Sequence, residues 1–197
     1  MDGTLINSGA IISNTINYVR INTGLKPMDS KILLENINNP NINPANFFYN
    51  TDTFTPKHSK LFEEYYDANC LKLVELYDGI DVLLEQLKKD GYLLAIATNA
   101  SNEFAVKTTK YLNIHKYFKY IIGYDDVKEP KPKPDMILKT LDYFDIKSND
   151  TIVVGDSKKD CLSAKGANVK CMLVNWGFTK YNNCVVYNNC NELYQAI

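Results

Sequence analysis

The segment YDGIDVLLEQLKKDGYLLAIATN, residues 77–99, indicates the fold class of this 197-residue chain. Its first part is amphipathic with the period of a helix and ends at Gly91, a residue type that often terminates helices. The part that follows, YLLAIAT, is a short and nearly continuous apolar run, as expected of a strand that is buried on both faces. A helix that leads directly into such a strand is typical of α/β proteins.

The alternation of helices and buried strands continues to the end of the chain. Further helices are predicted at 101–112, 134–144, 158–166 and from about Asn191, and further strands at 120–123, 151–156, 171–175 and 184–187. Strands that alternate with helices in this way form βαβ units with a parallel sheet, and right-handed crossovers place helices on both of its faces. Ligands of such sheets bind at the carboxyl ends of the strands.

The N-terminal part of the chain has a helical pattern without buried strands. Residues 8–23 carry apolar side chains at helical spacing, and Gly24 is well placed to end that helix. Residues 36–56 are rich in Asn and Pro and are predicted to form an irregular connection. Thr55–Pro56 supplies an N-cap followed by proline at the first helical position, which predicts one long helix over residues 57–76.

Composition excludes several classes of partner. Hydrophobic residues make up 45% and charged residues 23% of the chain, as in ordinary globular domains, and the formal net charge is −1. No strong field attracts nucleic acid or a membrane surface, and no apolar run reaches the roughly 18 residues of a membrane helix. The five cysteines are odd in number and form no C-x-x-C pair, which favours reduced thiols. We therefore expect a cytoplasmic protein that binds neither nucleic acid nor membranes.

Polar side chains stand next to the predicted strand ends. Thr98 and Asn99 follow one strand, Asp156 and Asp160 follow another, and Lys131 lies in a proline-rich loop before a helix. Each signal alone has an ordinary explanation. A Thr after a strand often caps a helix, a Lys beside prolines is often a solvated charge, and Gly-Asp is a common turn. The combined order of these residues along the chain is more specific than any one of them.

With the N-terminal DGTL, residues 2–5, these segments resemble the haloacid dehalogenase superfamily. Within that superfamily they are most similar to the phosphoglycolate-phosphatase-like hydrolases with a helical cap. The resemblance covers almost the whole chain and includes KPKPDMI (131–137), VVGDSKKDCLSAKGANV (153–169) and NWGF (175–178).

The resemblance implies an α/β fold with a Rossmann-like parallel-sheet core. The core is expected to comprise residues 1–12 and 78–197, and a helical cap is expected at residues 13–77. A cap in that place closes over the site, excludes bulk water and favours a small phosphorylated metabolite as substrate. Arg20 on the first cap helix either reaches an anionic group of the substrate or pairs with an acidic residue of the cap.

The resemblance also implies roles for individual residues in phosphate chemistry. Asp2 matches the general acid/base, which protonates the leaving oxygen and later deprotonates the attacking water. Thr98 matches the hydroxyl that binds the phosphoryl group, and the amide of Asn99 assists it. Lys131 matches the lysine that neutralises the negative charge of the phosphate and of the carboxylate nucleophile.

The implied cofactor is Mg²⁺. Asp2, Asp156 and Asp160 form the expected metal site, in which Asp156 is a ligand and Asp160 supports the metal and Lys131 from the next helical turn. Magnesium prefers oxygen ligands and keeps several waters, so one or two carboxylates and the phosphate of the substrate suffice.

One element of the family pattern is absent from the given sequence. The pattern is Asp-x-Asp-Gly-Thr-Leu, the first Asp is the nucleophile, and Met1 occupies the x position. Two interpretations remain open, a start site placed too late and a natural pseudoenzyme. Either way, we expect the chain as written to lack turnover and to hold magnesium less tightly. The preceding apolar strand would lie in the middle of the sheet, so we expect strand exchange, a dimer or a rearranged N-terminus to cover its position.

Two functions from different classes follow. The first is a Mg²⁺-dependent phosphomonoesterase that acts on a small phosphorylated metabolite through an aspartyl-phosphate in its full-length form. The alternative is a non-catalytic pseudophosphatase that keeps the fold and binds phosphorylated ligands or a protein partner.

Overall fold

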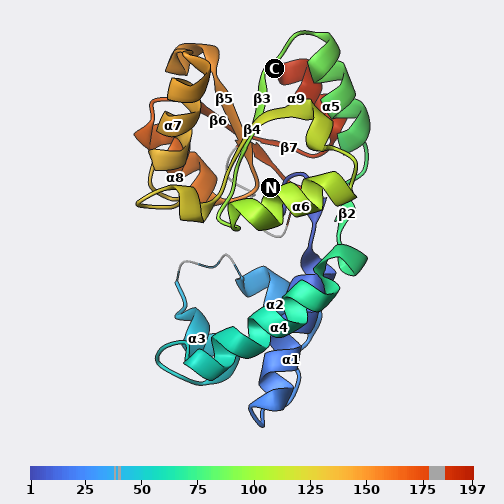
Figure 1. The fold of residues 1–197 in the computed structure, drawn as a ribbon, viewed down its shortest axis with the longest axis vertical. Coiled ribbons are helices and arrows are strands. Elements are labelled where there is room, and N and C mark those ends of the chain that lie inside the picture. Colours follow the sequence, from blue (N-terminus) through green and yellow to red (C-terminus); the bar gives the residue numbers. More distant parts are fainter. Residues whose placement is uncertain (38, 40, 178–184) are drawn as a thin grey trace. The chain divides into compact units, whose positions relative to one another are not determined.

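The computed structural model describes residues 1–37, 39, 41–177 and 185–197 and divides the chain into two compact units (Figure 1). Unit 1 comprises Met1–Ile6 and Leu76–Ile197, and unit 2 comprises Asn7–Glu75. The chain passes between the units at two points, where β1 (Ile6–Asn7) pairs with β2 (Glu75–Leu76). The sequence-based division placed these points at residues 12 and 78, and the structure therefore assigns the start of the first helix entirely to unit 2.

Unit 1 is an α/β structure in which every strand pair recorded after β2 is parallel. Its strands are β3 (Leu94–Ala97), β4 (Phe118–Ile122), β5 (Ile152–Gly155), β6 (Lys170–Val174) and β7 (Val186–Tyr187). Its α-helices are α5 (Ile80–Lys89), α6 (Asn102–Tyr111), α7 (Asp135–Phe144), α8 (Lys158–Gly166) and α9 (Cys190–Ala196). Short 3₁₀ turns lie at His115–Tyr117, Tyr124–Asp126 and Ser148–Asp150. The predicted parallel α/β architecture is therefore confirmed.

Helices lie on both faces of the strands of unit 1 (Figure 1), and alternate residues of β6 pack against helices on opposite faces. On one face, Met172 and Val174 of β6 pack with apolar residues of α5 and α9. On the other face, Val153 of β5 and Cys171 of β6 pack against α7 and α8. Successive side chains of a strand point to opposite faces, so the apolar runs of the sequence supply both layers of the core.

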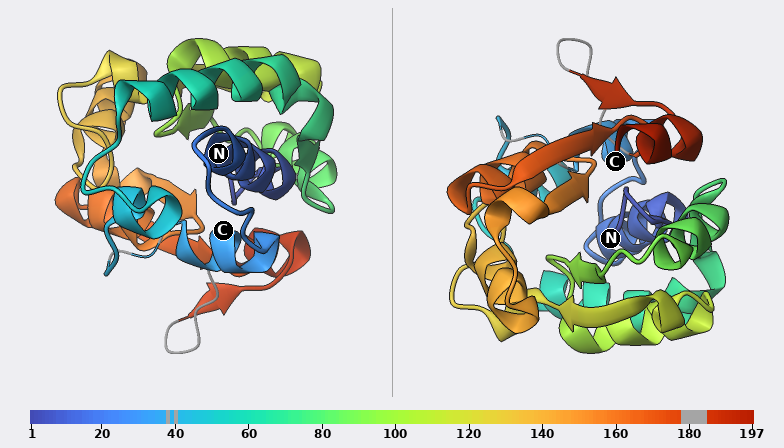
Figure 2. Two further views of the ribbon diagram at one scale, coloured as in Figure 1. Left: turned by 90° about the horizontal axis from the view of Figure 1, so that it is seen from below. Right: turned by 90° about the horizontal axis from the view of Figure 1, so that it is seen from above.

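The strands of unit 1 form two hydrogen-bonded groups in the described part of the chain (Figure 2). One group is β3–β4 and the other is β5–β6–β7, and no pairing between β3 and β5 is recorded among the described residues. The apolar run that contains β3 was predicted to be a strand buried on both faces. In the structure only Ile96 of β3 and Gly155 of β5 are buried, and the other residues of these strands are partly exposed. The reason is that each strand has a hydrogen-bonded neighbour on one side only.

Unit 2 is helical and consists of α1 (Gly9–Asn22), α2 (Ser30–Asn36), α3 (Pro44–Tyr49) and α4 (Pro56–Leu73). Its core is formed by buried residues of the first three helices, with Leu61 and Phe62 of α4 packed against them. The buried residues are Ile16, Val19, Leu33, Phe48 and Tyr49. The predicted cap of the long helix is confirmed, because the Thr55 hydroxyl accepts the His58 N–H at 3.2 Å.

One prediction about unit 2 is wrong, and one of the two alternatives for Arg20 is not observed among the described residues. Residues 36–56 are not wholly irregular, because α3 forms within them. The Asn43 side chain caps this helix by accepting the N–H groups of Ala45 and Asn46, and Pro44 occupies its first turn. No ion pair of Arg20 with an acidic side chain is recorded among the described residues, and its guanidinium donates to the backbone carbonyls of Lys26 and Phe48 instead. The buried guanidinium of Arg20 therefore has neutral carbonyl oxygens as its hydrogen-bond acceptors.

The prediction that the cysteines are reduced thiols is wrong for one pair. Cys161 of α8 and Cys171 of β6 form a disulfide, with their Cα atoms 5.3 Å apart, within the range that a disulfide needs. Among the described residues, neither Cys70 nor Cys190 takes part in a disulfide. Residues 38, 40 and 178–184, which include Cys184 and the start of the predicted strand 184–187, lie outside the described residues.

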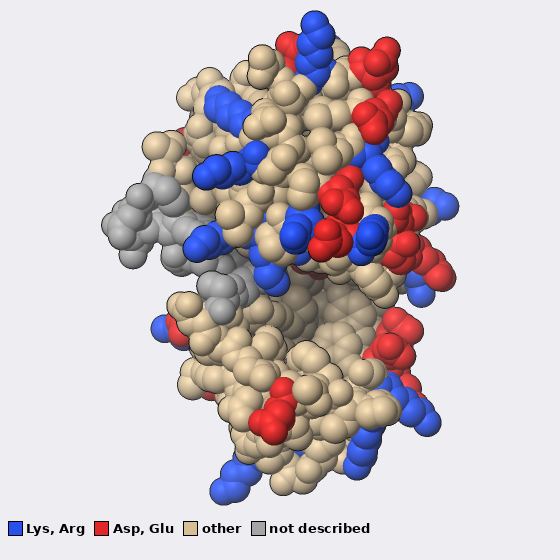
Figure 3. Space-filling view, turned by 90° about the vertical axis from the view of Figure 1, so that its left-hand side faces the viewer, with Lys and Arg blue, Asp and Glu red and all other residues tan. Residues whose placement is uncertain are grey.

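Lysines and acidic residues are interspersed on the face drawn in Figure 3, in agreement with the formal net charge of −1. Among the described helices, none combines the length and the apolar character that a membrane span requires.

A cavity at Met172 should destabilise the core of unit 1. This side chain is 2% exposed and packs between α5 and α9. Met172→Ala should therefore lower the free energy of unfolding by about 2–5 kcal/mol, measured by urea denaturation. Val82→Ala removes apolar atoms from a residue that is 67% exposed and should change that free energy by less than about 0.5 kcal/mol. Equal effects of the two substitutions would contradict the assigned core.

Candidate active site

The turn that carries Asp2 packs tightly against Asp156. The Met1 carbonyl accepts the N–H groups of Thr4 and Leu5 at 3.2 and 2.8 Å. Gly3 has φ +74°, and a Cβ at this position would lie 2.1 Å from Oδ2 of Asp156. Only glycine fits there, because it accepts the left-handed conformation and leaves space for the carboxylate. The Thr4 hydroxyl then donates to Oδ1 of Asp156 at 3.0 Å.

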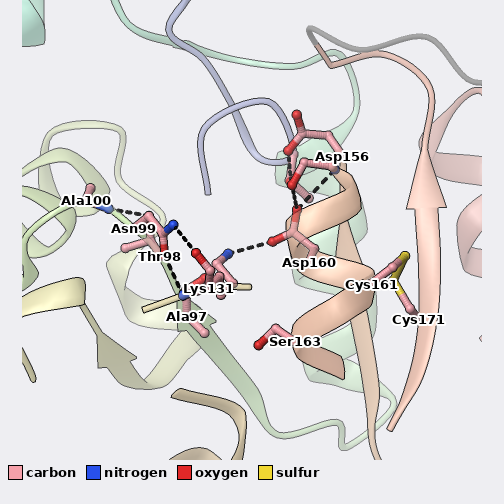
Figure 4. A network of polar contacts seen from close by, with 12 residues as sticks. Ala97, Thr98, Asn99, Ala100, Lys131, Asp156, Asp160, Cys161, Ser163 and Cys171 are labelled. Atoms are coloured by element: carbon pink, nitrogen blue, oxygen red, sulfur yellow. Dashed lines mark hydrogen bonds and ion pairs between the residues drawn. A yellow bond between two sulfur atoms is a disulfide. The ribbon is translucent and has the colours of Figure 1, made fainter. Parts of the chain in front are cut away.

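Lys131 is held at both its backbone and its ammonium group (Figure 4). The ammonium donates to the Ala97 carbonyl at 2.8 Å and to Oδ1 of Asp160 at 2.6 Å. The side chains of Lys131 and Asp160 are only 10% and 9% exposed, so this is a nearly buried ion pair. An ammonium group has three N–H donors, and these contacts use two of them. The third donor remains for an anion at the end of β3.

Asn99 supports Lys131 from the same strand end. Its Oδ1 accepts the Lys131 backbone N–H at 3.1 Å, and its Nδ2 donates to the Lys131 carbonyl at 2.9 Å. The sequence-based hypothesis placed this amide on the phosphate. In the structure both of its polar atoms bond to the backbone of Lys131, which makes Asn99 a support of the lysine loop.

Thr98 is 3% exposed and lies directly after β3. Its backbone N–H donates to the Ile122 carbonyl at 3.0 Å and extends the pairing of β3 with β4. Its hydroxyl oxygen accepts the Ala100 N–H at 3.1 Å. The hydroxyl hydrogen is therefore free to be directed at a phosphate oxygen.

Asp160 lies in the first turn of α8, and both of its carboxylate oxygens accept hydrogen bonds. Its Oδ2 accepts the Ser157 backbone N–H at 3.1 Å and the Ser157 hydroxyl at 2.6 Å, while Oδ1 faces Lys131. Burial alone would raise the pKa of Asp160, but the Lys131 ammonium and these hydrogen bonds outweigh it and hold the pKa below its usual value. A Cβ at Gly155 would lie 2.4 Å from the Asp160 Cβ, so the close approach of β5 requires glycine.

Four charged side chains of the predicted site converge around the first residue. The α-amino group of Met1 is buried, and its pKa is lowered first by burial and then by Lys131. The carboxylates of Asp2, Asp160 and Asp156 oppose this shift, so all four side chains lie within electrostatic reach of one point. Burial also raises the pKa of the Asp156 carboxyl to about 6. The structure thus brings together groups that are up to 158 positions apart in the sequence.

The donor set fits a divalent cation at Asp2 and Asp156. Oδ1 of Asp2 is buried without a hydrogen-bond partner among the described residues, which is costly for a carboxylate unless a cation or donor binds there. Asp160 is less suited as a direct ligand, since Lys131 and Ser157 use both of its oxygens. Within the described part of the chain, no three His, Cys, Asp or Glu side chains gather closely enough to form a metal site by themselves. The fit is to an ion such as Mg²⁺ that takes few protein ligands.

Two serines that order the site were not among the predicted site residues. Ser157 caps α8 and binds Asp160, and the Ser163 hydroxyl donates to the Lys133 carbonyl at 2.8 Å, which ties α8 to the lysine loop. The Ser157–Asp160 spacing matches the Ser-x-x-acid pattern that often opens a helix, so this contact had a sequence signal. The Ser163 contact had none, because it joins segments that are distant in the sequence.

Removal of Lys131 should expose the cost of a buried, unpaired carboxylate. Lys131→Met should lower the free energy of unfolding by about 3–5 kcal/mol. The double variant Lys131→Met/Asp160→Asn should lose less than the sum of the single variants, as measured by a urea-denaturation double-mutant cycle. Lys133→Met is the matched control, because Lys133 and Glu129 form an exposed pair at 3.8 Å. The control should cost less than about 1 kcal/mol, and additive effects of Lys131 and Asp160 would refute the coupling.

The chain matches a known protein family and several known proteins. Residues 1–174 match the family described as haloacid dehalogenase-like hydrolase. A phosphoglycolate phosphatase of Aquifex aeolicus is 34% identical over 131 residues, which cover 66% of this chain and 62% of that protein, so the match spans less than two thirds of the relative. The pyrophosphatase PpaX of Halalkalibacterium halodurans is 30% identical over 183 residues, which cover 89% of this chain and 81% of that protein.

Solved structures show the same fold. The crystal structure of a predicted phosphatase from Clostridium acetobutylicum is 26% identical in sequence and has a TM-score of 0.84. The superposition covers all of this chain and 94% of the other.

Proposed function

Since the chain belongs to the haloacid dehalogenase-like hydrolases, we propose that it serves as a Mg²⁺-dependent phosphatase of a small phosphorylated metabolite. The observation that carries this proposal is that Lys131 joins the end of β3 to Asp160 at 2.6 Å, while the turn of Asp2 packs against Asp156. A cation and an unpaired carboxylate beside a free threonine hydroxyl provide what a phosphomonoester needs, namely charge neutralisation and donors for its oxygens. The relatives named as phosphoglycolate phosphatase and pyrophosphatase act on small phosphorylated compounds, in line with this substrate class.

In the proposed site, the phosphoryl group lies between the end of β3 and the N-terminus of α8. The Thr98 hydroxyl and the third N–H of Lys131 donate to its oxygens. Asn99, the Ala97 carbonyl and Asp160 hold Lys131 in place, so little reorganisation is needed when the anion arrives. A bound Mg²⁺, held by Asp2 and Asp156, would supply further neutralisation of the phosphate charge.

Asp2 is proposed as the general acid and base. A carboxylate nucleophile at the position before Met1 would attack phosphorus and form an aspartyl-phosphate, while Asp2 gives a proton to the leaving oxygen. Asp2 would then take a proton from water as the water attacks the aspartyl-phosphate, which releases orthophosphate and restores the nucleophile. We propose that an apolar strand that ends in this aspartate, from the same polypeptide or from another chain, lies between β3 and β5. Within the described part of the chain, β3 and β5 each have a hydrogen-bonded neighbour on one side only, which supports that position.

A non-catalytic phosphate-binding role is the second candidate. This role is supported by Thr98 and Lys131, whose donors can bind a phosphate group without the carboxylate nucleophile. Phosphate binding therefore does not require phosphatase turnover.

The decisive experiment compares two versions of the protein. One begins at Met1 and the other is preceded by a short apolar segment that ends in Phe-Asp. We expect Mg²⁺-dependent release of phosphate from p-nitrophenyl phosphate only in the extended version, with loss in EDTA. Lys131→Met in the extended version should lower kcat by about 10²–10³-fold, because one charge stabiliser of the transition state is removed.

The same extension ending in Phe-Asn is the matched control and should be inactive. If the extended protein is inactive but binds inorganic phosphate in a calorimetric titration, the non-catalytic role is correct. If neither version binds phosphate, both functions are lost.

A further inference from the structure

The segment Asn175–Trp176–Gly177, directly after β6, packs against the turn that carries Asp2. The indole N–H of Trp176 donates to the Thr4 carbonyl at 2.9 Å, across 172 positions of sequence. Trp176 is the only tryptophan of the chain, and it also packs against the core formed by α5 and α9. Its ring is therefore anchored in the core while its N–H reaches the site.

Gly177 allows an unusually close approach between three segments. A Cβ at Gly177 would lie 2.4 Å from the Gly3 carbonyl oxygen and 2.7 Å from the Asp156 Cβ. Gly3 is restricted in the same way by the carboxylate of Asp156. The turn, the end of β5 and the loop after β6 thus meet at backbone distance, which side chains larger than hydrogen would prevent.

Thr4 is consequently held from two sides. Its carbonyl accepts from Trp176, and its hydroxyl donates to Asp156. The turn cannot rotate without breaking both contacts. Asp2 lies two residues earlier, and its buried Oδ1 has no hydrogen-bond partner among the described residues that could fix it directly. The position of that oxygen therefore depends on the turn.

We propose that Trp176 and Gly177 are positioning residues for Asp2, with Trp176 fixing the turn by its N–H and Gly177 by its lack of a side chain. The meaning of this role for catalysis rests on the proposed function, but the role itself is a property of the fold. Trp176 and Gly177 take part in no step of the proposed reaction, and this role explains their place beside the turn of Asp2.

The test uses hydrogen exchange of residues 1–6, followed by mass spectrometry of the full chain. Trp176→Phe keeps a ring but removes the N–H, and it should speed exchange in this peptide about fivefold, as expected for the loss of one hydrogen bond. Trp176→His restores an N–H at the equivalent position of a five-membered ring, because Nε2 of histidine corresponds to Nε1 of tryptophan. It should return exchange toward the original rate. Tyr194→Phe removes another ring-borne donor, to Asp90 at 2.7 Å, and should leave residues 1–6 unchanged.

The proposal is overturned if Trp176→Phe leaves the exchange of residues 1–6 unaltered, or if Trp176→His speeds it as much as Trp176→Phe does. Should Trp176→Phe unfold the protein, Gly177→Ala provides the second test, since its methyl group must displace the turn while the indole stays. Faster exchange confined to residues 1–6 in Gly177→Ala supports the proposal, and unchanged exchange refutes it.

A kinetic measurement separates this proposal from the proposed function. In a version of the protein with turnover of p-nitrophenyl phosphate, Trp176→Phe should lower kcat about fivefold and leave KM unchanged, because Thr98 and Lys131 bind the phosphate independently of the turn. A rise in KM with unchanged kcat would contradict a role at Asp2. If no version has turnover, the proposed function fails, and the exchange experiment still decides the positioning role.

Discussion

The ion pair between Lys131 and Asp160 is the interaction on which the site depends. Among the described residues, β3–β4 and β5–β6–β7 share a core but no strand-to-strand hydrogen bond. Lys131 bonds to the end of β3 through Ala97 and to α8, the helix after β5, through Asp160. It is thus a polar link between the two groups of strands at the edge where their carboxyl ends meet.

A buried ion pair is rarely present for stability alone. Removing two charges from water costs about as much as their attraction returns, so apolar residues of the same size would often be as stable. What the pair provides is a cation in a fixed place. Asn99, Ser157 and Ser163 all act on this arrangement, by holding the lysine backbone, the aspartate and the lysine loop respectively. The third N–H of the Lys131 ammonium is then available to the phosphate in the proposed function. The other two N–H groups limit the rotation of the ammonium group.

The site also shows why glycines are required at certain strand ends. Gly3, Gly155 and Gly177 each stand where a Cβ would overlap an aspartate or the backbone beside it. Carboxylates can be brought within reach of one point only if the segments that carry them approach at backbone distance. The charges repel each other at that distance, so a cation is needed among them, and Lys131 with a divalent metal ion answers that need in the proposed function.

Local patterns predicted the elements of the fold well. The Thr55–Pro56 cap, the helix over residues 158–166 and the parallel α/β order follow from short-range periodicity and capping, which act within a few residues. Residues 36–56 were predicted to be irregular because they are rich in Asn and Pro. That prediction was wrong because Asn43 and Pro44 are also a helix-start signal, and they begin α3. The disulfide between Cys161 and Cys171 was missed because the spacing of cysteines in sequence does not report the distance between a helix and a strand.

Patterns along the chain were enough to predict the parallel α/β class, the alternation of helices and strands, and the residue types at the strand ends. How those residues divide their hydrogen bonds became known only from the folded arrangement. In the structure, Asn99 bonds to the backbone of Lys131, both oxygens of Asp160 bond to Lys131 and Ser157, and the indole of Trp176 donates to Thr4. The physical reason is that periodicity and capping depend on neighbours in the chain. A polar contact instead depends on the distance between segments that the fold alone brings together.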